Sequence, residues 1–537
     1  MISVNPYSLT SLLLPLLFSL ITTTTSEELS TSDFITTWET TSNNEMITIP
    51  TTGPGYNYTV DWGDGTMTTG HNGNTSHSYS SPGNYQITIS GSFPRIFFNG
   101  TGDADNILSV DQWGTGIWIS MECAFKGCWK LDILASDIPI LNTGTSFKGM
   151  FAGTGMFNSD LSNWDVSNVV DMSEMFSYCS FNQNINSWDV SNVTNMSSMF
   201  NSNIEFDMPL NNWDVSMVTD MSLMFASALK FNQNLNSWDV SQVTDMTRMF
   251  QFAYYFNKAL YNWDVSNVVN IKSMFDGAEN FNGNISSWNL ASATELDEMF
   301  SNSGFNRNIN SWDVSNVTSM YHMFIGASNF NMPLSNWDVS NVTDMTRMFG
   351  FSGFNQDIGN WDVSNVTSMY EMFEQSAFDQ DISDWNVQSV NSFFGFLNNS
   401  GFSTENYDLL LSEWSELIVQ NNLDFGAMGI QYCAGEDGRN DLINNHLWNI
   451  TDAGKAGTIS IPNTFTNANN NNLWDDNANW SLGVVPNEIH AALIPSPLNA
   501  ELLNGQVGKC FTIEVEDGAN FLVELGADFR TTGPCNY

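Results

Sequence analysis

Basic residues are scarce in this chain. Lys and Arg number 14 among 537 residues, against 58 Asp and Glu, which gives a formal net charge of −44. Because the acidic share is ordinary, this charge comes mainly from the missing bases. Such a surface repels phosphate backbones and anionic lipid head groups. The composition therefore argues against nucleic acid and membrane surfaces as partners and leaves cations and basic partners open.

Long apolar runs are also missing. No stretch reaches the ~20 apolar residues that a membrane-spanning helix needs, so we expect no membrane insertion. One short apolar run, residues 12–21, is followed by small polar residues. This pattern is typical of a secretory signal peptide. We predict that residues 1–25 are removed and that the mature protein is secreted or held at the cell surface.

The sequence lacks the common catalytic motifs. Its histidines form no metal-spaced pair, and neither a Gly-x-Ser-x-Gly elbow nor a phosphate-binding loop is present. We therefore predict a protein that is not an enzyme, with no catalytic residue and no cofactor apart from calcium, for which weak candidates exist.

What the sequence does have is a repeat. The stretch from Phe181 to Phe200, FNQNINSWDVSNVTNMSSMF, recurs with small changes from about residue 157 to residue 397. Its Trp falls at residues 164, 188, 213, 238, 263, 288, 312, 337, 361 and 385, in steps of 24 or 25. A fixed period of this length predicts a solenoid, in which each unit is stable only against its neighbours.

Each unit is predicted to form a strand, a tight turn, a short strand and one helical turn. The helical turn is expected because Met196, Met199 and Phe200 have i, i+3, i+4 spacing after Asn195, a good N-cap residue. Core packing is the expected role of the aromatic and Met columns. Their structural members are Trp188, Trp213, Trp238, Trp263, Met199 and Phe200.

The Asp that follows each Trp has two interpretations. Stacked about 5 Å apart in water, neighbouring carboxylates repel each other by about 0.8 kcal/mol, so something must offset this cost. The side chain accepts from the backbone two residues on, as in an Asx turn, or the column collects calcium. We favour the turn, because Asn replaces Asp at positions 289 and 386. The calcium candidates are Asp189, Asp214, Asp239 and Asp264.

Residues 33–91 alternate strand-like runs with turn clusters, which predicts a small antiparallel sandwich. Within them, Trp62-Gly63-Asp64-Gly65-Thr66 and the later His77-x-Tyr79-x-x-Pro82-Gly83-x-Tyr85 resemble the signature of the PKD domain family. The resemblance implies an extracellular spacer or binding module. Asp61 and Asp64 are weak calcium candidates, although an Asp in such a turn more often bonds its own backbone.

The segment MECAFKGCWKLDIL, residues 121–134, resembles the leucine-rich repeat of the Treponema pallidum type. The main repeat resembles the surface-protein repeats that accompany it in BspA-like proteins. This resemblance implies a right-handed leucine-rich-repeat-like solenoid that acts through contacts with other molecules. It carries over no binding residue.

The end of the chain is predicted to close the array. Residues 402–422 have helical spacing and suit a cap, and residues 431–454 suggest a second helix and a closing strand. An Asn-rich linker and a small strand-rich module follow. Cys128 and Cys179 lie two coils apart, about 10 Å, which is beyond disulfide reach. We expect both to be core thiols and leave the pairing of Cys510 with Cys535 open.

The expected fold is mainly β with short helical turns. The predicted domains are a signal peptide at 1–25, a PKD-like β-sandwich at 26–100, a solenoid at 101–400, its cap at 401–457 and a linker with a small β-rich module at 458–537. The expected function is adhesion, or binding of extracellular proteins or glycans. The alternatives are a carbohydrate-binding accessory or scaffold protein for polysaccharide use, and a degraded hydrolase or lyase.

Overall fold

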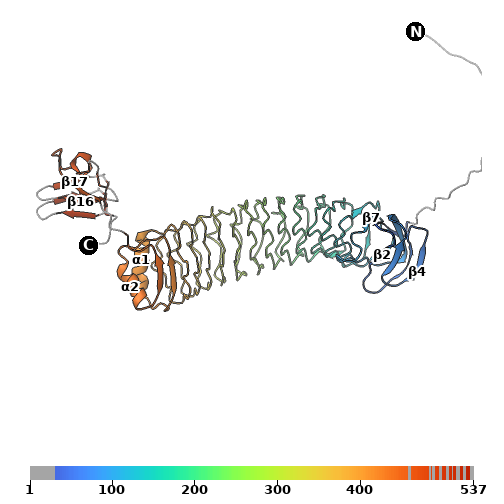
Figure 1. The fold of residues 1–537 in the computed structure, drawn as a ribbon. Helices are drawn as coiled ribbons and strands as arrows, with labels where there is room; N and C mark the ends of the chain where they lie inside the picture. The colour runs from blue at the N-terminus through green and yellow to red at the C-terminus, as the bar shows by residue number, and fades with distance from the viewer. Residues whose placement is uncertain are drawn as a thin grey trace, which may run out of the picture.

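The computed structural model describes residues 31–456, 461–482, 485–486, 490–494, 499–503, 507–510, 512–515, 520–523 and 528–531. The predicted signal peptide therefore lies outside the described residues. The fold is mainly β with a few short helices. Figure 1 shows a long array of stacked coils with sheet strands at its N-terminal end and helices near its other end.

The N-terminal part contains a six-stranded sheet and a separate strand pair. The sheet has the order β4-β3-β6-β1-β7-β9, and β2 pairs with β5. The strands are β1 (Phe34–Thr40), β2 (Glu45–Ile49), β3 (Asn57–Asp61), β4 (Met67–His71), β5 (Thr75–Tyr79), β6 (Gly83–Ser92), β7 (Ile107–Gln112) and β9 (Asp132–Ile133). All pairings are antiparallel except that of β7 with β9.

This sheet continues past the predicted domain boundary at residue 100. Strands β7 and β9 belong to the sheet although they follow that residue in sequence. Trp113 and Trp118 are buried, and Trp113 packs edge-on against Trp164 of the first full repeat at 5.4 Å. One hydrophobic core therefore runs from the sheet into the array without interruption. The first coils pack against the sheet, as later coils pack against each other.

Short strand pairs lead into the array: β8 (Ile117–Trp118) with β10 (Ile140–Leu141), and β11 (Thr145–Ser146) with β12 (Val169–Asp171), both parallel. We number the ten full coils by their Trp, from coil 1 with Trp164 to coil 10 with Trp385. Positions within a coil are counted from the Phe that begins it, such as Phe181 in coil 2.

From position 16 to position 22 of a coil, the backbone N–H groups alternate between two partners. Ser198 and Phe200 donate to the next coil, to the carbonyl oxygens of Ser222 at 2.8 Å and Met224 at 2.9 Å. Between them, Met199 donates three residues back within its own coil, at 3.2 Å. Every second amide thus ties one coil to the next.

The predicted helical turn is wrong. Ser198 and Ser202 have φ of 56° and 57°, in the left-handed region, and positive φ recurs at positions 18 and 22 of the other coils. A helix would use each N–H inside its own segment, whereas this array needs alternate N–H groups along its axis. The predicted strands are also reduced. Between residues 181 and 401, all described, pairing is limited to isolated bridges at position 15 and one at Phe393.

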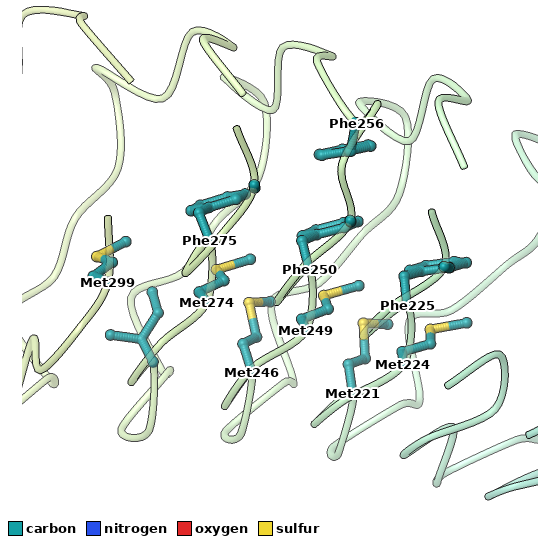
Figure 2. Packing of buried hydrophobic residues seen from close by; sticks show 14 of the residues in the cluster. Met221, Met224, Phe225, Met246, Met249, Phe250, Phe256, Met274, Phe275 and Met299 are labelled. Carbon is teal, nitrogen blue, oxygen red and sulfur yellow. The ribbon is translucent and has the colours of Figure 1, made fainter. Parts of the chain in front are cut away.

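The core of the array consists of ladders of identical side chains. Phe250 stacks on Phe225 and Phe275 at 5.6 and 5.7 Å, with the Met columns beside them (Figure 2). Trp238 stacks on Trp213 and Trp263 at 6.4 and 6.5 Å. These side chains are at most 4% exposed. Removing one therefore takes contacts from both neighbouring coils.

The last coil is covered by helix α1 (Thr404–Ser415), which buries Tyr407, Leu410, Leu411 and Trp414. The helix is shorter than predicted, and Ile418, expected on its apolar side, is 82% exposed. Helix α2 (Glu436–Asn444) and the parallel pair β13 (Asp424–Ala427) and β14 (Asn449–Asp452) complete the cap. The cap was predicted in kind but not in its exact limits.

The C-terminal module has its own small core around Trp474 and Trp480. Its elements are β15 (Ile461–Thr464), η1 (Asn477–Asn479), β16 (His490–Ile494), β17 (Asn499–Leu502), β18 (Val507–Cys510), β19 (Thr512–Val515), β20 (Asn520–Val523) and β21 (Asp528–Thr531). The strands pair in parallel, as β15-β16-β19, β17-β20 and β18-β21. A strand-rich module was predicted here.

Candidate binding surface

A column of Asn and Asp side chains links the coils at position 2. The Oδ1 atom of Asn158 accepts the backbone N–H of Asn182 at 2.8 Å, and the bond repeats at each coil junction at 2.8–3.1 Å. We call this column the Asn ladder. Its members are Asn158, Asn182, Asp207, Asn232, Asn257, Asn282, Asn306, Asn331, Asn355 and Asp379.

The Asn ladder fixes the orientation of its own amides. Because Oδ1 must face the N–H donor of the next coil, the Nδ2 group must point elsewhere. The Nδ2 groups of Asn232, Asn257 and Asn282 make no hydrogen bond to any described residue. Each therefore presents a pair of donors, held in place by the fold, to a ligand.

Three shallow hollows lie on the surface formed by positions 2 to 7, which we call the polar face. Their volumes are about 410 Å³ over coils 1 to 3, 480 Å³ over coils 4 and 5, and 520 Å³ over coils 5 to 7. Amide and hydroxyl side chains dominate their walls, together with the half-exposed ring of Tyr261. The polar face is thus a discontinuous groove along the array.

The Trp column supports the polar face from beneath. The Nε1 atom of Trp238 donates to the carbonyl oxygen of Leu210 in the preceding coil at 2.9 Å, and Trp213 and Trp263 do the same one coil to either side. Position 5, which accepts this bond, lies within the polar face. The remaining predicted structural residues, Trp188, Met199 and Phe200, are also buried. The floor of the groove is therefore held by bonds between coils.

The Asp column at position 9 has the geometry of an Asx turn, as predicted. Oδ1 of Asp189 accepts from the backbone N–H of Ser191 at 3.1 Å and from its hydroxyl at 2.6 Å. Asp214, Asp239 and Asp264 accept the same backbone bond. Asn289 makes it too, at 3.1 Å. An amide replaces the carboxylate without loss of the turn.

In several members of the Asp column these bonds favour the ionised form of the carboxyl. In Asp214 and Asp264 the hydroxyl and then the backbone N–H of the serine two residues on lower the pKa of the carboxyl. The same cause lowers the pKa of Asp313 and Asp362. The negative charges of these four residues are therefore stabilised locally, each within its own coil.

Asp61 and Asp64 hold a turn of the N-terminal sheet. Asp61 accepts the backbone N–H of Gly63 at 3.0 Å. Asp64 accepts the N–H and hydroxyl of Thr66 at 3.0 and 2.6 Å and lies 2.8 Å from Nε2 of His77. Burial opposes ionisation of Asp64, but the bonds from Thr66 and His77 outweigh it and lower its pKa. Both carboxylates are used by the protein itself.

Within the described part of the chain, no group of three or more His, Cys, Asp or Glu side chains is arranged to hold a metal ion. Cys123, Cys128 and Cys179 are buried free thiols, and Cys433 is disulfide-bonded. The pairing of Cys510 with Cys535, which the sequence leaves open, falls outside the described side chains. No described helix combines the length and apolarity needed to cross a bilayer.

Position 18 carries the titratable groups that come closest to an acid–base constellation. The guanidinium of Arg347 pairs with Glu371 and lies over the ring of Tyr370 at 5.6 Å. His322 stacks on Tyr321 at 3.7 Å. Burial and then the charge of Arg347 lower the pKa of His322. Both bases are engaged by neighbours, and none of the hollows of the polar face includes them.

The Asn ladder and the polar face were missed from the sequence. The signal was present, because the residue after the first Phe is Asn or Asp in all ten units. The sequence pattern predicts a strand for this segment, and in a strand alternate side chains point away from the sheet and carry no bonds between coils. An Asn or Asp that recurs at one position of a stacked repeat is better interpreted as a partner for the next coil's backbone.

Comparison with known proteins gives one result. Five overlapping segments match the family described as "Mycoplasma protein of unknown function, DUF285": residues 95–207, 145–263, 194–308, 253–352 and 294–414. Together they span residues 95 to 414, the array and the start of its cap. No curated protein and no solved structure matches the chain. The matched segments cover more than half of the sequence, and the chain belongs to the DUF285 family of repeat proteins.

Proposed function

We propose that this chain is a secreted or cell-surface protein, not an enzyme, whose polar face binds extended glycans. The observation that carries the proposal is the position of three hollows on one face of the array, all lined mainly by amide and hydroxyl side chains. A glycan chain lying along the array would meet an Asn or Asp at position 2 of each coil.

The chemistry of the polar face suits sugars. Sugar hydroxyls donate and accept hydrogen bonds, and the Nδ2 groups of the Asn ladder offer donors that the fold has already oriented. Such preorganisation lowers the entropy cost of binding. Tyr261, 49% exposed at the edge of one hollow, provides a ring on which the apolar side of a pyranose can stack.

The architecture and location belong to the same proposal. We infer a right-handed leucine-rich-repeat-like solenoid of the BspA type with a PKD-like sandwich before it, and export directed by residues 1–25. Binding a host or environmental glycan gives adhesion, and binding a nutrient polysaccharide gives a scaffold role. Amino-terminal sequencing of protein from the culture supernatant or cell surface tests export, and an intact Met1 in the cytosol would contradict it.

Protein binding is a second candidate, favoured by apolar side chains at the corners of the coils. Trp129, Met156 and Tyr255 are 52%, 73% and 55% exposed. Met156 and Tyr255 immediately precede the Phe residues that begin coils 1 and 5, and Trp129 lies before the ten numbered coils. None of the three lines a hollow of the polar face. A protein ligand would use these side chains and leave the polar face free.

A binding array of glycans and matrix proteins, probed with the full mature chain, separates the two candidates. Tyr261→Ala should weaken glycan binding without lowering the melting temperature, because this ring is exposed. Tyr255→Ala is the matched control, since it removes an equally exposed ring outside the hollows. Loss of binding in the Tyr255 variant alone would favour the protein ligand and contradict the glycan proposal.

A further inference from the structure

The polar face over coils 4 to 7 contains two basic residues. The two hollows in this region share Ala259, so they adjoin each other. Lys258 lines one hollow and Arg307 the other. The remaining residues that line these two hollows are Asn, Gln, Ser, Tyr, Ala or Gly. We call this surface the basic groove. The hollow over coils 1 to 3 differs, because it includes Asp160 and no base.

Neither base is neutralised by the protein. Elsewhere carboxylates pair with Lys126, Lys130, Lys230, Lys272, Arg347, Arg439 and Lys455. Lys258 and Arg307 form no ion pair with any described residue, and neither do Arg95, Lys148 and Arg248, although the chain has about four acidic residues for each basic one. Of these five, only Lys258 and Arg307 line a hollow of the polar face. Arg307 donates through Nε to the carbonyl oxygen of Asn282 at 2.9 Å. This bond holds the guanidinium beside the groove, and its terminal nitrogens have no described partner.

The two bases have a defined spacing. Both occupy position 3, in coils 5 and 7, and Gly283 occupies that position in coil 6 between them. No side chain therefore separates them. Two coils correspond to ~10 Å at the usual spacing of neighbouring strands. An extended polysaccharide advances by about one sugar residue per coil, so the bases face every second sugar.

We propose that the basic groove binds a polysaccharide with one anionic group, carboxylate or sulfate, on every second sugar. The inference rests on the proposed glycan-binding function and names the class of ligand. The terminal nitrogens of Arg307 can bind either group through two parallel hydrogen bonds, and Lys258 acts as a point charge. Asn282, in the coil between the two bases, presents its Nδ2 group to the neutral sugar.

The net charge of −44 limits the charge density of the ligand. Exposed charges beyond the Debye length, ~8 Å at physiological ionic strength, are largely screened. A polymer with one charge per disaccharide thus responds mainly to the two nearby bases. A polymer charged on every sugar places extra anions where no base meets them. The groove should therefore prefer sparse charge to dense charge.

Calorimetry with the full chain at physiological salt tests the proposal. The probes are hyaluronan, with one carboxylate per disaccharide, its methyl ester, which is neutral, and keratan sulfate, which carries sulfate without carboxylate. We expect the chain to bind hyaluronan or keratan sulfate about tenfold or more tightly than the ester, as charge-assisted bonds imply. The difference between the affinities for hyaluronan and keratan sulfate shows whether the groove prefers carboxylate or sulfate.

Variants assign the effect to the basic groove. Lys258→Gln with Arg307→Gln should preserve the fold, because Gln occupies position 3 in coils 2, 4, 9 and 10. This double variant should bind the anionic polymer about tenfold more weakly and the ester unchanged. The control, Lys148→Gln with Arg248→Gln, removes the same charge away from the groove.

Three results would overturn the inference. The first is equal affinity for hyaluronan, keratan sulfate and the ester, which leaves glycan binding intact but removes the preference for charge. The second is an equal loss in both double variants, which means diffuse attraction. The third is no binding of any polymer, neutral or anionic, which overturns the proposed function as well.

Discussion

Asp379, at position 2 of coil 10, accepts a 2.8 Å hydrogen bond from the backbone N–H of Ser403, the N-cap residue of α1. The Asn ladder therefore does not stop at the last coil. The last member of the ladder, Asp379, also accepts at Oδ1 a 2.8 Å hydrogen bond from Nδ2 of Asn406 in the first turn of the helix. A carboxylate at this place also interacts favourably with the helix N-terminus. The same bond that joins coil to coil docks the cap.

Asp379→Ala should loosen the cap. The change leaves the N–H of Ser403 and the amide of Asn406 without their acceptor, which costs about 1–3 kcal/mol. Hydrogen exchange should show faster exchange over residues 404–415, with the middle coils unchanged. Asp384→Ala is the control, because it removes an exposed carboxylate from the same coil. Equal effects of the two changes would mean that charge, not the bond, matters.

Trp238→Ala should destabilise the coils on both sides of it. Truncating a buried aromatic typically costs about 3–5 kcal/mol, and Trp238 contacts Trp213 and Trp263 as well as the carbonyl of Leu210. Protection from hydrogen exchange should fall over residues about 210 to 265. Trp238→Phe keeps a ring and loses the N–H donor, so it should cost less. A loss confined to residues 236 to 240 would contradict stacked coils.

Gly353→Ala should destabilise the array at the junction of coils 7 and 8. A Cβ at this residue would lie 2.2 Å from the carbonyl oxygen of Ser328, so the coils must separate. Overpacking of this kind typically costs about 1–3 kcal/mol. Gly350→Ala is the matched control. Its Cβ would meet no atom closer than 3.4 Å and its φ is not positive, so we expect a melting temperature equal to or above that of the wild type.

Replacing Asp189, Asp214, Asp239 and Asp264 together by Asn should leave the array folded. The amide oxygen can accept the same backbone bond, as Asn289 already does, and repulsion along the column is relieved. The melting temperature should stay the same or rise slightly. The calcium alternative is tested in the same experiment. If the wild type shows a calcium-dependent rise at high salt and the variant does not, the column binds calcium specifically.

Acid should weaken the array through the same column. Hydrogen bonds from the hydroxyl and the backbone N–H of the serine two residues on lower the pKa of several carboxyls in this column. Four of them are Asp214, Asp264, Asp313 and Asp362. A carboxyl with a lowered folded-state pKa stabilises the fold above its unfolded pKa of ~3.9, and this stability is lost as pH falls through the folded value. The melting temperature should therefore drop below about pH 4. Changing these four residues to Asn should make the drop smaller, and parallel pH profiles would contradict the prediction.

The period of the array and its buried columns could be predicted from the sequence. The recurrence of Trp and of the Met-Phe pair every 24 or 25 residues requires stacking, since one unit cannot bury enough surface alone. The Asx turn was also predictable, because Asn289 and Asn386 replace Asp. Each of these features restricts the residue types at its positions, so the sequence alone reveals it.

The backbone path within a coil could not be predicted. Left-handed residues are usually recognised by Gly or Asn, but positions 18 and 22 hold Arg248, Phe252 and Arg347, among others, at φ of 49–57°. The bonds between coils offset the strain. The basic groove was missed for a related reason, since only stacking brings Lys258 and Arg307, 49 residues apart in sequence, to the same surface.

The Asn ladder runs in one direction, since each Oδ1 serves the following coil and never the preceding one. A coil is thus completed by whatever unit precedes it, provided that unit carries Asn or Asp at position 2. One unit can therefore take the place of another, and this bond does not fix how many units the array contains. Gain or loss of a unit lengthens or shortens the polar face by one step, so the number of units sets how long a ligand the face can accommodate.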